Sequence, residues 1–251
     1  MRSIHDKLTV VVPARLGSNR VKGKNFRLLN GAPLICHIIR RLKQTQWLRN
    51  VCINSDSELF ARLAAAEGVG FYHRPKELAT SGSPIDEYIY EFIKSTGSDH
   101  LAVVNPSCPF VEPERLDQAW RQYVESDCDT QLSGYRVQTH CFYQGKALNF
   151  STVGKLPRSQ DLDPVLALNF AITIWDCRKY VANYESEGYG VFTGKLGFFE
   201  VEENEIVDVD YEQDFVFAEF VARFLEQGRK VEAQYPEFFE EYLREHPDIQ
   251  N

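Results

Sequence analysis

Apolar runs alternate with amphipathic segments along the first half of the chain. Residues 8–14, LTVVVPA, form a continuous apolar run that is typical of a strand buried on both faces. Residues 33–44 carry apolar side chains at helical spacing, and Pro33 suits the first turn of a helix. This succession predicts an α/β fold, with a mostly parallel sheet covered by helices on both faces. Further strands are expected at 50–56, 68–75, 100–109 and 168–176, and further helices at 57–68, 84–94, 113–125 and 211–228.

Residues 129–167 break this alternation, because aromatic residues and glycine turns replace the helical spacing. They predict a small β-hairpin excursion from the main sheet. The sheet is then expected to resume, with a strand, a turn and a second short strand over residues 195–210. No linker interrupts the sequence, which indicates a single domain over residues 1–251.

Composition limits the classes of partner. The 251 residues carry a formal net charge of −8, with 28 Lys and Arg against 36 Asp and Glu. No basic stripe points to nucleic acid, and no apolar run approaches the roughly 20 residues of a membrane-spanning helix. The N-terminal residues lack the pattern of a secretory leader, and the six cysteines are scattered without a CxxC pair. We therefore expect a cytoplasmic protein with reduced thiols and no nucleic-acid or membrane partner.

A cationic loop follows the first apolar run, in a chain that is acidic overall. Residues 15–25 contain two glycines, which let the backbone turn tightly, and four cations. In α/β sheets, ligands bind at the carboxyl ends of the strands, so this loop suits a polyphosphate. It matches neither the GxxxxGK[ST] nor the GxGxxG phosphate motif, and a solvated basic turn is the alternative interpretation.

The sequence VDVD at 207–210 contains two aspartates separated by one valine. On a strand, Asp208 and Asp210 point to the same face, where they repel each other unless a cation lies between them. A few carboxylates together with substrate phosphates suit Mg²⁺. The alternative is that one aspartate caps the helix that follows.

Other polar residues stand at expected strand ends and loops. Asp56 is expected to cap the helix at 57–68, whereas Arg74 and Asn105 suit contacts to a phosphate, a base or a ribose. Asn169 opens an apolar strand, and a buried Asn needs hydrogen-bond partners. Taken singly, each of these residues is better explained as a turn or surface residue. The histidines and cysteines form no pattern that selects a nucleophile.

Seven segments in order resemble one family. PARLGSNRVKGKN resembles the PARxGSxxxxxKN loop of the acylneuraminate cytidylyltransferases, also called CMP-sialic acid synthetases. NGAPLICHII, INSDSELFARLAAAEGVGFYHRPKELA and VNPSCPF are similar to the next three motifs, and RSQDL, LNFAI and VDVDYEQDFVFAE to the last three. The related Kdo cytidylyltransferases share the first loop but fit less well at RPKELA and at VDVDYEQDFVFAE.

The resemblance implies a nucleotidyltransferase with a Rossmann-like fold of the nucleotide-diphospho-sugar transferase type. It implies that the protein transfers CMP from CTP to an acceptor, releases pyrophosphate with Mg²⁺, and forms a homodimer through residues 129–167. The nucleotide-binding residues carried over are Arg15, Ser18, Asn19, Arg20, Lys24, Asn25, Arg74, Ser83 and Asn105. Lys24, Arg15 and Asp210 are the expected catalytic residues, Asp208 and Asp210 the metal ligands, and Arg158, Gln160, Asn169 and Phe170 the acceptor-binding residues.

Departures from the family pattern concentrate at the acceptor elements. Phe170 stands where the family has the glycine of NGA, and Asn105 replaces a glutamine. A nonulosonic acid needs a cation for its carboxylate, which Arg158 offers, whereas Phe170 is expected to shrink the pocket. We expect a nonulosonic, sialic-type acceptor for cell-surface glycan synthesis. The alternatives are a small phosphorylated acceptor, such as phosphoglutamine in capsular phosphoramidate synthesis, and a catalytically inactive nucleotide-binding protein.

Overall fold

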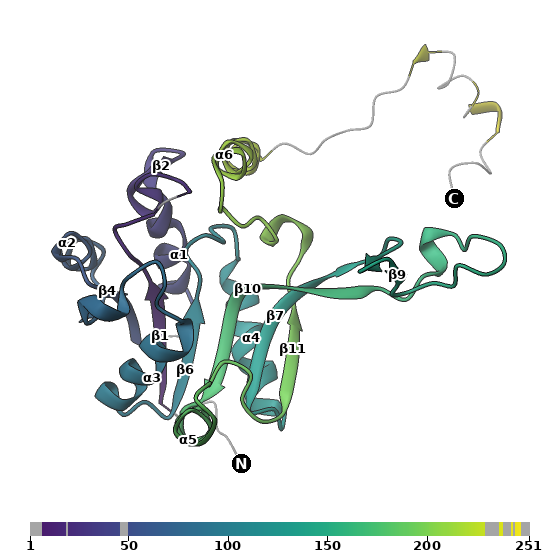
Figure 1. Cartoon of the computed structure of the whole chain (residues 1–251). Helices are drawn as coiled ribbons and strands as arrows, with labels where there is room; N and C mark the ends of the chain where they lie inside the picture. The colour runs from purple at the N-terminus through teal and green to yellow at the C-terminus, as the bar shows by residue number, and fades with distance from the viewer. Residues whose placement is uncertain are drawn as a thin grey trace.

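A seven-stranded sheet forms the centre of the molecule in the computed structural model (Figure 1). The structure describes residues 7–18, 20–45 and 50–228, together with 236, 237, 242 and 244–246. The strand order is β11-β7-β10-β6-β1-β4-β5, and β10 runs antiparallel to both of its neighbours while the remaining pairs are parallel. The strands are β1 (Leu8–Pro13), β4 (Asn50–Ser55), β5 (Gly70–His73), β6 (His100–Val104), β7 (Thr130–Val137), β10 (Val165–Asp176) and β11 (Leu196–Glu200). The predicted mixed, mostly parallel α/β sheet is confirmed.

Six helices connect or flank these strands in the described part of the chain, and the alternation of the first half follows the prediction closely. The second helix begins at Ser57, whose hydroxyl accepts a hydrogen bond from the Leu59 amide, and ends at Gly68 with a φ of 68°. The expectation that Asp56 caps this helix was wrong, because the serine one residue later does so. The helices are α1 (Leu34–Leu42), α2 (Glu58–Glu67), α3 (Ile85–Thr96), α4 (Pro113–Glu125), α5 (Cys177–Glu187) and α6 (Glu212–Glu226).

Successive residues of β1 belong to two different hydrophobic clusters, one on each face of the sheet. Val10 and Val12 pack in a cluster with side chains of α1, α2 and α4, whereas Val11 packs in a second cluster with side chains of α3 and α5. All three valines are fully buried. The continuous apolar run therefore reflects helices on both faces, as the sequence predicts.

A third cluster attaches the C-terminal part of the chain to the loop after β1. It joins Val21 of that loop to Val207 and Val209, and these to Phe215 on α6. The small two-stranded sheet β2 (Leu28–Leu29) and β3 (Ala32–Pro33) borders the same cluster. Burial of these apolar side chains holds two segments together that are about 190 residues apart in the sequence.

The excursion begins later in the chain than the sequence predicted. Residues 130–137 form β7, an inner strand that pairs with both β10 and β11, so the boundary at 129 was wrong. Residues 138–164 extend away from the sheet as an arm, with the small hairpin β8 (Phe142–Tyr143) and β9 (Lys146–Ala147), as Figure 1 shows. No helix among the described residues is long and apolar enough to cross a membrane.

One buried carboxylate fixes the turn that leads from β11 to residues 207–210. Glu205 is 2% exposed and accepts hydrogen bonds from the amides of Glu112 and Glu202 and from Arg115 Nε, at 2.9 to 3.0 Å. Removing it leaves the Arg115 guanidinium with less compensation for its burial.

We expect Glu205→Ala to lower the free energy of unfolding by about 3 kcal/mol. The control is Glu200→Ala, which breaks a pair with Arg136 in which both side chains are largely exposed. That change should cost less than about 1 kcal/mol. Equal losses for the two variants in urea denaturation would contradict the assignment.

Candidate active site

The loop after β1 has a fixed base and an open rim. The Ala14 amide donates to the Asn54 carbonyl at 3.0 Å, and Val21 is buried. Gly23, with a φ of 63°, then leads into the short 3₁₀ helix η1 (Lys24–Phe26). Arg15, Ser18 and Arg20 lie on the rim and line a pocket of about 450 Å³.

Lys24 connects this loop to VDVD, 185 residues later. Its Nζ donates to the Val209 carbonyl at 2.7 Å and lies 3.3 Å from Asp210 Oδ1. Arg20 Nη2 lies 3.0 Å from the same carboxylate oxygen. The structure thus places three predicted residues, two cations and one carboxylate, around one pocket.

The VDVD segment belongs to no strand and lies outside the sheet, so the predicted short strand was wrong. Val209 donates its amide to the Ser107 carbonyl at 2.9 Å, and the two valines pack inward. Asp214 Oδ2 accepts from the amides of Asp210 and Tyr211, at 2.9 and 2.7 Å, which fixes the turn into α6. The alternation that suggested a strand comes from the hydrophobic cluster rather than from strand pairing.

Asp208 is suited to hold a cation. Its Oδ1 is buried and has no hydrogen-bond partner among the described residues. Burial raises the pKa of Asp208 above its ordinary value, a hydrogen bond from Ser107 opposes this, and the nearby Asp210 adds to it. The described residues contain no group of three or more His, Cys, Asp or Glu side chains that could hold a metal ion. Asp210 lines the first pocket, whereas Asp208 lines neither pocket. The unpartnered Asp208 oxygen and the Asp210 carboxylate are oxygen donors of the kind that Mg²⁺ binds, and such an ion commonly takes its remaining ligands from water and substrate.

A second pocket, of about 290 Å³, adjoins the first and shares Arg15, Lys24, Asn25 and Ser81 with it. The Asn25 side chain reaches both pockets, and its buried Oδ1 has no hydrogen-bond partner among the described residues. The combined space is lined by the ends of β1 and β6 and by the loop before α3. Polar side chains from separate segments thus converge on one cavity, which is typical of a ligand site.

Arg74 is the anchor of this second pocket. It is 4% exposed, and its Nε and Nη2 donate to the side-chain and backbone oxygens of Asn54, at 2.7 and 2.9 Å. Its guanidinium lies 4.1 Å from the centre of the Tyr88 ring. Burial lowers the pKa of Arg74, and Tyr88 and Asp56 oppose this shift. The arginine is thus held rigidly with its charge at the pocket wall.

Ser83 and Asn105 also line the second pocket. Ser83 Oγ donates to the Glu77 carbonyl at 3.0 Å, and Asn105 Oδ1 accepts from the Ser107 amide at 3.2 Å. Sequence reasoning missed Tyr88 and Ser81, because neither stands out in its segment. Asn19 lies outside the described residues.

The predicted acceptor residues are not brought together. Arg158 and Gln160 lie on the arm, and neither lines the two pockets. Arg158 pairs with Asp161 through two hydrogen bonds, at 2.8 and 2.9 Å. Asn169 instead lies in β10, where its Oδ1 accepts from Ser133 Oγ at 2.8 Å.

Phe170 occupies a strained position in β10. Its φ is 51°, a conformation that favours glycine, and the pairing of β10 with β7 shifts register between Leu168 and Thr173. The Ala171 carbonyl next to it accepts the Asn105 amide at 2.9 Å, so this bulge borders the second pocket. The Phe170 ring packs against the second hydrophobic cluster.

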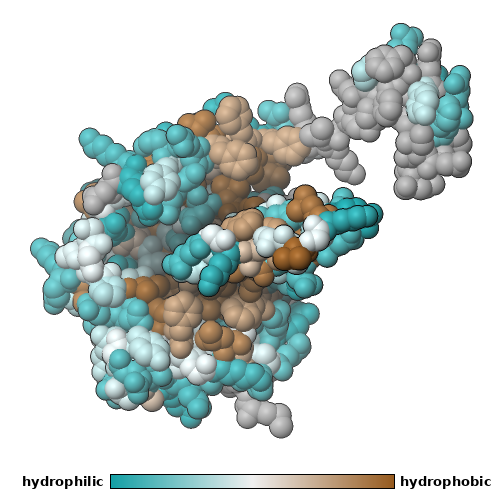
Figure 2. All heavy atoms as spheres, turned by 45° about the vertical axis from the view of Figure 1, so that its right-hand side comes forward, coloured by the Kyte–Doolittle hydropathy of each residue, from teal (hydrophilic) through white to brown (hydrophobic). Residues whose placement is uncertain are grey.

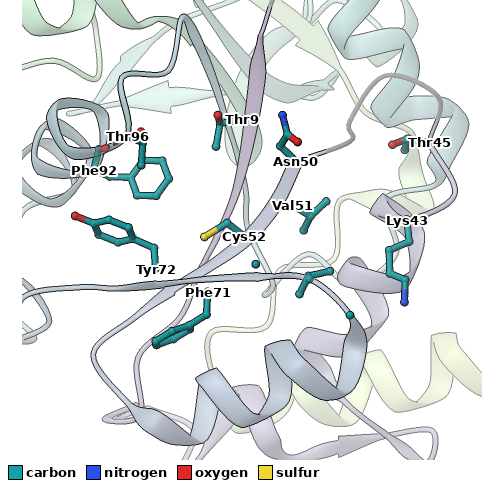
Figure 3. Close-up of a pocket in the computed structure, with 13 residues that line it drawn as sticks. Thr9, Lys43, Thr45, Asn50, Val51, Cys52, Phe71, Tyr72, Phe92 and Thr96 are labelled. Atoms are coloured by element: carbon teal, nitrogen blue, oxygen red, sulfur yellow. Dashed lines mark hydrogen bonds between the residues drawn. The ribbon is translucent and has the colours of Figure 1, made fainter.

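Another pocket, of about 720 Å³, lies at the N-terminal ends of β4 and β5, away from the loop pockets (Figure 3). Asn50 Nδ2 donates to the Leu8 carbonyl at 3.3 Å, and Thr96 Oγ1 donates to the Phe92 carbonyl at 2.9 Å. Burial raises the pKa of the Cys52 thiol to about 11, which makes it a poor nucleophile. These polar groups are engaged within the fold, so the loop pockets remain the candidate active site.

The strain at Phe170 can be tested by comparing two truncations. Phe170→Gly and Phe170→Ala both lose the ring, but only glycine relieves the positive φ. We expect the glycine variant to be more stable by about 1 kcal/mol. At Leu168, which lies in the same strand without a positive φ, alanine should be more stable than glycine. Chemical denaturation of the four variants measures which of glycine and alanine is more stable at each position. If the same residue is more stable at both positions, Phe170 is not strained.

Comparisons with known proteins point to one family. The profile of the family described as Cytidylyltransferase matches residues 9–235. The N-acylneuraminate cytidylyltransferase of Streptococcus agalactiae serotype V is 24% identical over 215 residues, which cover 82% of this chain and 51% of that protein. The CMP-N,N'-diacetyllegionaminic acid synthase of Legionella pneumophila is 28% identical over 192 residues, covering 70% of this chain and 81% of that protein. The chain spans about half the length of the streptococcal relative.

Solved structures share the fold. A CMP:2-keto-3-deoxy-manno-octonic acid synthetase complexed with CTP superposes with a TM-score of 0.66 at 16% identity, covering 89% of this chain and all of that chain. The 4-diphosphocytidyl-2C-methyl-D-erythritol synthase of Anaerococcus prevotii gives a TM-score of 0.64 at 10% identity, covering 87% of this chain and 96% of that chain. These neighbours confirm the Rossmann-like nucleotidyltransferase fold. On the family match over residues 9–235, this chain belongs to the cytidylyltransferase family.

Proposed function

We propose that the chain is a nucleotidyltransferase that transfers CMP from CTP to an acidic acceptor and releases pyrophosphate. The observation that carries this proposal is the approach of Arg20 and Lys24 to Asp210 around one pocket. Cations on a glycine-containing loop suit a triphosphate, and an opposed carboxylate pair suits its metal ion. The family match and the named activities of the relatives support the same conclusion.

In this proposal the two adjoining pockets divide the nucleotide. Arg74, Ser83 and Asn105 bind the nucleoside end, whereas Arg15, Ser18 and Arg20 bind the triphosphate. An acceptor oxygen forms a bond to the α-phosphorus as the bond to the pyrophosphate oxygen breaks, and the acceptor proton is released. Lys24 and Arg15 offset the negative charge that builds up on the departing pyrophosphate. Asp208 and Asp210 hold Mg²⁺, which neutralises charge on the triphosphate when bound.

A nonulosonic acid is the acceptor we favour, for use in cell-surface glycan synthesis. Relatives named for acylneuraminate and legionaminic acid transfer support this class. A second candidate is a small phosphorylated acceptor such as phosphoglutamine. It is favoured because Arg158 does not line either pocket, which leaves the carboxylate of a nonulosonic acid without that cation there. The Phe170 ring, which was expected to shrink the pocket, packs in the hydrophobic cluster instead and favours neither acceptor.

We further propose a cytoplasmic homodimer formed through the arm. Phe142, Tyr143, Leu148 and Leu156 are all more than half exposed along residues 138–164. Apolar side chains gather on the arm in Figure 2, and also at the top of that view, where α6 lies. Exposed apolar surface of this kind is typical of a contact between chains.

An acceptor panel tests the activity. Pyrophosphate release is measured with CTP, Mg²⁺ and, in separate reactions, sialic, legionaminic and pseudaminic acids, Kdo and phosphoglutamine. Turnover of a nonulosonic acid without turnover of phosphoglutamine would support the favoured acceptor, and the reverse would support the second candidate. If CTP shifts the melting temperature but no acceptor is turned over, the chain is a nucleotide-binding protein without catalysis.

Asp208→Asn should separate stability from activity. We expect turnover to fall by about 100-fold or more, because the variant loses a charged metal ligand. Without metal, the variant should melt at a higher temperature than the wild type at pH 7, because the native state no longer buries an ionised carboxylate.

The pH dependence of that difference has a definite sign. Because the pKa of Asp208 is raised in the native state, its ionisation destabilises the fold as the pH rises above the ordinary value of 3.8. The gain in stability should therefore vanish below that value, where both states are protonated, and grow as the pH rises above it, until Asp208 is ionised in the native state as well. Melting curves in EDTA across this range measure it, and a variant less stable at pH 7 would contradict the assignment.

A further inference from the structure

One oxygen of Asp210 is shared by two cations. Arg20 Nη2 lies 3.0 Å and Lys24 Nζ 3.3 Å from Asp210 Oδ1. The backbone amide of Asp210 is held by Asp214 at 2.9 Å, so the carboxylate cannot easily move away from them. Three groups that the proposed reaction assigns to metal and triphosphate therefore compensate one another in the chain without ligands.

The two cations differ in how firmly they are held. The Lys24 side chain is 18% exposed, and its Nζ also donates to the Val209 carbonyl at 2.7 Å. The Arg20 side chain is 53% exposed, and its guanidinium lies 5.1 Å from the centre of the Tyr211 ring. A hydrogen bond with Tyr211 and, to a smaller extent, coulombic attraction to Asp210 raise the pKa of Arg20. Arg20 is thus the more exposed partner of Asp210, on the rim of the loop, and Lys24 is the more buried partner with an additional hydrogen bond.

We propose that Asp210 acts as a counter-ion latch that suppresses binding of metal-free nucleotide. A triphosphate without metal must take Arg20 away from Asp210 and leave that carboxylate facing its own negative charge. With a metal ion held by Asp208 and Asp210 this cost would be lower, because the ion would neutralise the Asp210 carboxylate and leave Arg20 available to the triphosphate. The inference rests on the proposed function and adds that the site selects the metal-loaded nucleotide before any chemistry occurs.

The latch makes binding of metal and of nucleotide interdependent. Because such coupling is reciprocal, a change that weakens the latch should raise affinity for free nucleotide and reduce the benefit of adding metal. Exposed ion pairs are individually weak, so the expected change is modest, about fivefold in the dissociation constant.

Titration calorimetry of CTP in EDTA at fixed ionic strength tests the latch. Asp210→Asn should bind metal-free CTP about fivefold more tightly than the wild type, because it releases Arg20. Glu212→Gln is the matched control, because it also removes one negative charge, two residues after Asp210 in the sequence. Glu212 pairs with Arg27, and neither residue lines either pocket. This control should bind metal-free CTP as the wild type does.

The background variant Arg20→Gln distinguishes a latch from a general effect of charge. In that background, adding Asp210→Asn should bring little further gain. A gain of the same size with and without Arg20 would overturn the latch, as would wild-type affinity for metal-free CTP in Asp210→Asn. If the wild type binds CTP with Mg²⁺ and either of these results is obtained, the proposed function stands and the latch alone fails. If no form binds CTP even with Mg²⁺, the proposed function and the latch both fail.

Discussion

The hydrogen bond from Lys24 Nζ to the Val209 carbonyl, at 2.7 Å, joins the two halves of the candidate site. One half is the loop after the first strand, and the other is an extended segment near the end of the described fold. Neither half has the partners to form a site alone, because the loop supplies cations and the segment supplies carboxylates. The contact therefore converts two unrelated stretches of sequence into one cavity of opposed charges.

Packing below this contact sets its geometry. Val21, Val207 and Val209 are buried in one cluster with Phe215 of α6, and Asp210 beside them lines the first pocket. On the other side of the second pocket, β6 ends in a loop that is tied to β10 through the Asn105 amide. The sheet thus supplies rigid strand ends, and the polar loops between them carry the ligand-binding groups.

Features that depend on neighbouring residues were predicted from the sequence better than features that depend on contacts between distant residues. Buried strands and capped helices were predicted well, because side-chain periodicity and residues such as Gly68 are local signals. The sequence prediction assigned the residues of β7 to the excursion, because nothing local in their sequence shows that they pair with β10 and β11 of the main sheet. The positive φ of Phe170 was beyond prediction from a phenylalanine, although the glycine of the resembled motif was a signal for it. For residues assigned by motif, such as Arg158, the resemblance predicted a role in binding but could not predict where the fold places the side chain.

Some of the buried polar atoms without partners belong to residues at or next to the candidate site. Among the described residues they include Asn25 Oδ1 and Asp208 Oδ1, together with Asn54 Nδ2 behind Arg74. Such atoms cost free energy in a folded protein, and most folds satisfy them internally. Of these three residues only Asn25 lines the two pockets, so a ligand bound there is positioned to complete the hydrogen bonding of its side chain. A ligand that supplies both a metal ion and polar groups would satisfy such atoms. The free energy that the unsatisfied atoms cost the ligand-free protein would then contribute to the affinity for the ligand.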